Sequence, residues 1–107
     1  MSMKTETTAS SAFGRLNPGD EAKLVLELTA TEANSIEGRV LEKIDETNYR
    51  RTNDTSRVSY DSTTRLVMGK ASDVHNGAVV HVTSKMGNDR VLHASQIVIL
   101  TGYVKVQ

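Results

Sequence analysis

Two histidines lie on neighbouring apolar segments in the second half of the sequence, His81 within AVVHVTSK and His93 within LHASQIVIL. If residues 86–88 form a three-residue loop between two antiparallel strands, His81 and His93 face each other across the ladder. Two cross-strand imidazoles can bind zinc or copper, but a metal site normally needs three or four ligands. Since no carboxylate is placed to complete the set, we favour two exposed histidines and expect no metal cofactor.

Residues 49–70 form a second group with binding chemistry, because five basic residues and two tyrosines share this stretch with only two aspartates. Aromatic rings stack on flat groups and cations bind anionic ones, so these residues suit a ligand that has both. The candidate ligand-binding residues are Tyr49, Arg51, Arg57, Tyr60 and Arg65. The alternative is a solvated hairpin whose cations pair with the acidic first half of the chain.

Enzyme chemistry has little support in the sequence. There is no nucleophile elbow, no phosphate-binding glycine loop and no metal-binding His-Glu helix motif. The chain has no cysteine, which excludes disulfides, thiolate metal sites and cysteine nucleophiles. We therefore expect a protein that is not an enzyme and carries no cofactor.

The composition indicates one small domain with an aliphatic core. The 107 residues are 37% hydrophobic, with one Phe, three Tyr and no Trp. Thirteen basic residues balance thirteen acidic ones, so the overall charge gives no general attraction to nucleic acid or membranes. Residues 1–47, however, hold five basic and nine acidic side chains, a net of −4, and residues 48–107 hold eight and four, a net of +4. One side of the fold can therefore be basic.

The sequence contains no apolar run of the roughly 18 residues that a membrane-spanning helix needs. Its start, MSMKTETTASSAFG, also lacks the apolar centre of a signal peptide. We expect a soluble chain without membrane insertion, and the cytoplasm is slightly favoured. The compartment itself stays unknown, because an export signal upstream of the first residue is an open alternative.

The chain divides into a flexible lead-in over residues 1–20, which ends in the turn Asn-Pro-Gly-Asp, and a single domain over residues 21–107. Apolar and polar residues alternate over residues 22–30, which favours a strand, although one helix face also fits. Residues 35–45 alternate more clearly. Their phase slips near Leu41, and Gly38 would allow the sheet to curl.

The remaining elements are predicted to be two hairpins joined by one helical turn. Asp61 and Ser62 suit a tight turn between a strand carrying Val58 and Tyr60 and another carrying Leu66 and Met68. Residues 70–77 suit a single helical turn, and two strands follow it. In the last strand, Leu92 and Ala94 have the opposite parity to Ile97 and Ile99, so all four line the core only if a bulge lies at Ser95-Gln96.

The segments TTRLVMGKASDVHNGAVVHVTSK and LHASQIVIL resemble the second half of small bacterial OB-fold domains, named for oligonucleotide and oligosaccharide binding. The matching positions are Thr64, Asp73, Val74, Gly77, Val80, Val82, Leu92, Ala94, Ile97 and Ile99. The resemblance covers residues 63–100, and residues 34–60 agree only in the order of their elements. It implies an all-β fold: a five-stranded Greek-key barrel with one short helical turn and an extra N-terminal strand.

This resemblance implies a non-catalytic binding module, with single-stranded nucleic acid as the expected ligand. The alternative is a protein-interaction or envelope-associated OB domain with no nucleic-acid role. Residues 101–107, TGYVKVQ, continue the strand-like alternation. As an uncovered edge strand they would pair with a protein partner or a second copy of the chain, or else fold back on the N-terminal strand and close the barrel.

Overall fold

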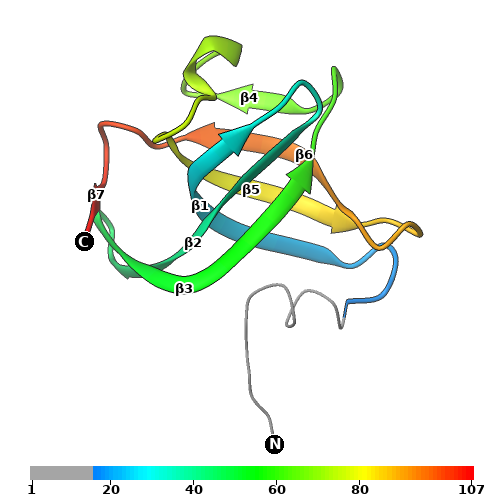
Figure 1. Cartoon of the computed structure of the whole chain (residues 1–107), viewed down its shortest axis with the longest axis horizontal. Helices are drawn as coiled ribbons and strands as arrows, with labels where there is room; N and C mark the ends of the chain where they lie inside the picture. The colour runs from blue at the N-terminus through cyan, green and yellow to red at the C-terminus, as the bar shows by residue number, and fades with distance from the viewer. Residues whose placement is uncertain (1–15) are drawn as a thin grey trace, which may run out of the picture.

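The structure, a computed structural model, describes residues 16–107 (Figure 1). The strands are β1 (Glu21–Thr31), β2 (Ser35–Asp45), β3 (Asn48–Ser59), β4 (Arg65–Val67), β5 (Val79–Met86), β6 (Leu92–Ile99) and β7 (Lys105–Val106). A single 3-10 turn, η1 (Ala71–Asp73), lies between β4 and β5 in this part of the chain. The predictions of an all-β chain and of one short helical turn are therefore confirmed. Residues 1–15 of the predicted lead-in lie outside the described residues.

Five of the strands pair in a closed ring. β1 lies between β2 and β5 and is antiparallel to both. β3 pairs with β2, and β6 pairs with β5, again antiparallel. A short parallel contact, in which Val58 of β3 lies opposite Leu92 of β6, closes the ring. The two shortest strands lie outside it, β4 beside β6 and β7 beside β3.

β1 confirms the strand predicted over residues 22–30, but its place in the sheet differs from the prediction. We expected an extra strand outside a set of five, whereas β1 is a member of the ring with partners on both edges. Its alternation explains this position, because Leu24, Leu26 and Leu28 are all buried while the residues between them are more exposed. The Asn-Pro-Gly-Asp turn before it also forms, closed by the Asp20 amide donating to the Asn17 carbonyl at 2.9 Å.

The hairpin predicted at Asp61-Ser62 is wrong. β3 ends at Ser59, and β4 pairs in parallel with β6 instead of returning along β3. Two contacts redirect the chain: the Asp61 carboxylate accepts the Thr63 amide at 2.8 Å, and the Thr64 hydroxyl donates to the Ala94 carbonyl of β6 at 2.9 Å. The turn therefore carries the chain across to β6.

Aliphatic side chains fill the interior of the ring, as the scarcity of aromatic residues predicts. Leu26, Val58 and Val80, from three different strands, are each 0% exposed. The core cluster comprises Ala22, Leu24, Leu26, Leu28, Ile36, Val58, Ala78, Val80, Val82, Met86, Leu92, Ala94, Ile97 and Ile99. The ring therefore encloses one continuous core, and residues of the opposite parity on these strands face away from it.

The bulge predicted in the last strand is confirmed. Gln96 lies opposite Thr83 and Ala94 lies opposite Ser84, so Ser95 is the additional residue on β6. Because the bulge changes the parity of the strand, the apolar residues on both sides of it, from Leu92 to Ile99, reach the same core.

The predicted pairing of His81 with His93 is wrong. His81 lies opposite Val98, and His93 lies opposite Lys85, four positions further along β5 or about 13 Å at roughly 3.3 Å per residue. The cause is a longer β5–β6 loop than the three residues assumed. The Gly87 amide bonds the Val91 carbonyl at 2.9 Å, and Arg90 inside the loop adopts φ 63°.

The backbone of β1 lies directly against Gly38 of β2, where the sequence predicts a curl. Gly38 lies opposite Leu28, next to a register shift between Leu28 and Ala30 on β1. A Cβ atom at position 38 would lie 2.5 Å from the Glu27 carbonyl oxygen. Glycine is therefore required where the ring curves.

A smaller apolar cluster lies on the outer side of the sheet. Leu41, Tyr49 and Val79 are buried in it, and Val25, Leu100, Val104 and Val106 pack against it. The C-terminal segment covers this cluster by pairing with β3, since the Gln107 amide donates to the Tyr49 carbonyl at 2.8 Å. Residues 101–107 thus fold back as we considered, but onto β3 and not onto the N-terminal strand.

Candidate functional site

A hollow of about 340 Å³ opens over β1, β2, β3 and β5. The side chains that form it are Lys23, Val25, Leu41, Lys43, Tyr49 and His81. Strand pairing brings them together, because Val25 lies opposite both His81 and Leu41. Since Val25 alternates with the core residues of β1, the hollow lies on the outer face of the ring. We call it the outer hollow.

The floor of the outer hollow is apolar. Val25 and Leu41 form its centre, and Tyr49, opposite Lys43, closes it on the β3 side. Tyr49 is only 8% exposed, because its ring packs within the outer apolar cluster. The floor is therefore fixed by packing, and a flat apolar group can rest on it without displacing a side chain.

Two lysines form the rim of the outer hollow. Lys23 lies 4.0 Å from Glu21, and Lys43 lies 3.0 Å from Glu46. Both pairs are more than half exposed, so solvent screens them and they contribute little. Either ammonium group can therefore exchange its carboxylate partner for an anion that enters the hollow.

His81 adds a titratable group to the same rim. Burial, and then the nearby Lys23 ammonium, lowers the pKa of His81 below its ordinary value of about 6.5. His81 is therefore neutral at pH 7 when the hollow is empty. An anion beside it would favour its protonated form.

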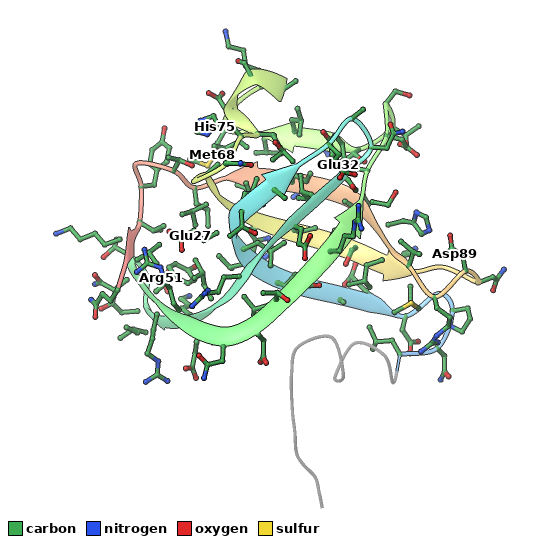
Figure 2. All side chains as sticks on the ribbon, viewed as in Figure 1. Glu27, Glu32, Arg51, Met68, His75 and Asp89 are labelled. Carbon is green, nitrogen blue, oxygen red and sulfur yellow. The ribbon has the colours of Figure 1, made fainter. Side chains whose placement is uncertain are left out.

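Arg51 borders the outer hollow, opposite Leu41. It donates to both carboxylate oxygens of Glu27 on β1, Nε to Oε1 at 2.7 Å and Nη2 to Oε2 at 3.1 Å (Figure 2). These hydrogen bonds lower the pKa of Glu27, whose side chain is only 22% exposed. Because Arg51 neutralises this carboxylate, Glu27 does not strongly repel an anion that binds the lysines of the rim.

The structure divides the five residues predicted from sequence into separate groups. Tyr49 and Arg51 lie at the outer hollow. Arg57 and Tyr60 lie toward the other end of β3, where both contact Glu32: the Arg57 guanidinium at 3.0 Å from its carboxylate, and the Tyr60 hydroxyl donating to its carbonyl at 3.1 Å. Arg65 is exposed on β4.

Sequence reasoning did not identify Lys23, Val25, Leu41 and Lys43 as site residues, and it considered His81 only as a metal ligand. Two signals pointed to this face. The alternation of residues 22–30 gives Lys23 and Val25 the parity opposite to the core leucines, and the alternation of residues 35–41 likewise places Leu41 on the outer face. Neither signal shows that four strands bring these residues together, because that depends on register.

The histidines do not form a metal site of the kind considered. Within residues 16–107, no three His, Cys, Asp or Glu side chains lie close enough together to hold a metal ion. His93 hydrogen-bonds the Asp89 carboxylate at 3.0 Å beside the β5–β6 loop, whereas His81 lines the outer hollow. In the same part of the chain, no helix has the length and apolar character needed to cross a bilayer.

No protein-family model matches the chain, and no curated protein matches it either.

Proposed function

We propose that the chain is a non-catalytic binding module of the OB type and that it binds single-stranded nucleic acid at the outer hollow. The order of the ring supports the OB assignment: β1, β2, β3, β6 and β5, antiparallel except where β3 meets β6, with η1 before the last two strands. In OB-folds the second and third strands form the usual ligand face. The outer hollow opens beside that face.

One observation carries the proposal: a packed apolar floor and two lysines line the same hollow, and the ion pairs of both lysines are exposed to solvent. A nucleotide has the complementary chemistry, a flat base attached to an anionic phosphate. The volume, about 340 Å³, lies at the lower end of the range for ligand pockets, which suits one base rather than a large ligand.

The residues predicted from sequence take different parts in this proposal. Tyr49 supplies part of the floor, and Arg51 keeps Glu27 neutralised at its border. Arg57, Tyr60 and Arg65 would contact the ligand only if the nucleic acid continues beyond the hollow toward the other end of β3. A short oligonucleotide therefore depends on the lysines more than on these three residues.

The test is fluorescence anisotropy with a labelled oligothymidine, comparing the wild-type chain with the double variant Lys23→Gln/Lys43→Gln. We expect the double variant to bind more weakly. Its plot of log K against log salt should also be shallower by about 1.4, since each lost phosphate contact on a single strand removes about 0.7 from the slope. Lys70→Gln is the matched control, because Lys70 is exposed next to η1 and lies outside the outer hollow.

Equal loss of binding in Lys70→Gln and in the double variant would contradict the assignment of the site. Absence of salt-dependent binding in the wild-type chain would contradict the nucleic-acid function itself.

A second candidate function, docking of a protein strand, is favoured by the position of β7 as the last strand in the sheet order. The Lys105 amide donates to the Thr47 carbonyl just before β3, and the Gln107 amide donates to the Tyr49 carbonyl of β3. The Val106 amide has the opposite parity and therefore points to the outer edge of β7. Val106→Pro would remove that donor while leaving the bonds to β3 in place. If β7 mediates self-association, sedimentation should show a concentration-dependent mass that this substitution abolishes. A constant monomer mass would exclude a second copy as the partner.

A further inference from the structure

A second hollow, of about 330 Å³, lies between the β1–β2 turn, the loop from β3 to β4, and η1. These segments meet at the end of the ring where β4 lies beside the β1–β2 turn (Figure 1). The hollow shares no lining residue with the outer hollow. We call it the end hollow, and it has its own combination of apolar and polar groups.

One wall of the end hollow is apolar and fixed in place. Tyr60, Leu66 and Val74 line it, and all three are half-buried because they pack against the main core. Tyr60 is held by two hydrogen bonds. Its hydroxyl donates to the Glu32 carbonyl at 3.1 Å, and its backbone amide donates to the Asn34 backbone carbonyl at 2.9 Å. The wall is therefore a preformed surface for an apolar group.

The facing side of the end hollow carries a carboxylate with free hydrogen-bonding capacity. Asp61 Oδ1 accepts the Thr63 amide at 2.8 Å and the Thr63 hydroxyl at 2.5 Å, and the Thr64 amide is a weaker donor to the same carboxylate, so lone pairs of Oδ2 stay accessible to a ligand. The Thr63 hydroxyl and then the Thr63 amide lower the pKa of Asp61, so the group is ionised at neutral pH. No basic side chain of this part of the chain forms an ion pair with it.

Two further polar groups lie beside this carboxylate. The side-chain amide of Asn34 and the hydroxyl of Ser62 line the end hollow, and neither has a hydrogen-bond partner among the residues that the structure describes. Together with Asp61 they present several acceptors for N–H groups and one negative charge. A ligand that fits this arrangement has an apolar body and a cationic, hydrogen-bond-donating head.

We propose that the end hollow is a binding site for a small amine whose apolar body packs on Tyr60, Leu66 and Val74 and whose ammonium group binds Asp61. The side-chain Oδ1 of Asn34 and the Ser62 hydroxyl accept the remaining ammonium hydrogens. Charge selects the ligand class, because the Asp61 carboxylate would repel an anionic molecule of the same shape.

The experiment titrates 2-phenylethylamine into the isotope-labelled full chain and follows the backbone amide resonances. Phenylacetate is the matched probe, since it has a similar apolar body and the opposite charge. We expect saturable shifts around the β1–β2 turn, residues 60–66 and η1 with the amine, and no saturable shifts there with phenylacetate. Equal binding of both probes, or no saturable shift with the amine in the millimolar range, would overturn the proposal.

Asp61→Asn tests the carboxylate. Asparagine keeps the oxygen that accepts the Thr63 amide and removes the charge, so the dissociation constant should rise about tenfold or more. Asp45→Asn is a closely matched control, because Asp45 accepts the Thr47 amide at 3.0 Å in the same local pattern but lies at the β2–β3 turn. An Asp61→Asn chain that binds the amine like the wild type would contradict the site.

Ala71→Leu tests the shape of the site independently of its charge. Ala71 lines the end hollow and is itself exposed, so a larger side chain there fills the space without entering the core. We expect loss of amine binding although Asp61 is intact. Retention of binding would mean that the amine associates with surface charge only. The Lys23→Gln/Lys43→Gln variant should bind the amine normally, which separates this site from the proposed nucleic-acid site.

Discussion

Replacing Gly38 by alanine would introduce one methyl group against the backbone of β1. The new Cβ atom would lie 2.5 Å from the Glu27 carbonyl oxygen and 3.1 Å from the Leu28 Cα atom. Both neighbours are backbone atoms, so the contact can be relieved only by separating the strands. The strands would have to separate next to the register shift on β1, where the ring curves.

Two opposing effects set the size of the change. Replacing glycine by alanine at an unstrained site stabilises a protein by about 0.4–1 kcal/mol, through the entropy of the unfolded chain. Overpacking of a tight site costs about 1–3 kcal/mol. We therefore expect Gly38→Ala to lower the free energy of unfolding by about 1–2 kcal/mol, which corresponds to a fall in Tm of roughly 4–16 °C for a domain of this size.

Thermal and urea unfolding followed by circular dichroism measure this loss. Gly87→Ala is the control, because its Cβ would meet Asp89 Oδ1 at 2.5 Å and His93 Cδ2 at 2.8 Å, atoms at the ends of side chains that can rotate away. Its loss of stability should be smaller than that of Gly38→Ala, because it is limited to the exposed hydrogen bonds that Asp89 makes to the Val91 amide and to His93. If Gly38→Ala is as stable as the wild type, or if both variants lose the same amount, the curvature assigned to Gly38 is wrong.

Three further predictions concern the core and the outer hollow. Leu26→Ala should lower the free energy of unfolding in urea by about 2–5 kcal/mol, because Leu26 is 0% exposed, and a loss below about 1 kcal/mol would contradict the packing described. Ser84→Ala should cost about 1 kcal/mol in the same assay, since the buried Ser84 hydroxyl donates to the Ala22 carbonyl at 2.9 Å; a neutral effect would mean that this bond does not stabilise the fold. The lowered pKa of His81 means that the unfolded chain binds a proton at this histidine more readily than the folded chain does. The contribution of neutral His81 to the free energy of unfolding should therefore be complete above about pH 6.5 and decline as the pH falls through the folded-state pKa. His81→Gln should flatten this part of the pH profile, and an unchanged profile would show that His81 is not responsible.

The strands and the core were largely predictable because burial on one face leaves a two-residue period in the sequence. Leu24, Leu26 and Leu28 show that period, and the parity change between Ala94 and Ile97 revealed the bulge at Ser95. These signals are local, so they can be identified in the sequence without knowing which strands pair.

The pairing of strands was less predictable because loop geometry determines it. Positive φ at Arg90 and the hydrogen bonds of Asp89 lengthen the β5–β6 loop, which moves His93 away from His81. The contact of Thr64 with Ala94 likewise directs β4 to β6, 30 residues along the chain. Neither contact leaves a periodic pattern in the sequence.

The outer hollow was only partly predictable for the same reason. Tyr49 and Arg51 were found because they belong to a local basic and aromatic stretch. Lys23 and Lys43 resemble ordinary solvent-facing residues of two separate strands, and only the register places both of them beside Val25 and Leu41.

The central claim is that the outer face of β1, β2, β3 and β5 receives single-stranded nucleic acid. Titration of an oligothymidine into the isotope-labelled chain tests it most directly, because backbone amide shifts identify the contacted residues. We expect saturable, salt-sensitive shifts at residues 23–25, 41–43, 49–51 and 81. Shifts confined to other parts of the sheet, or no shifts at low salt, would contradict it.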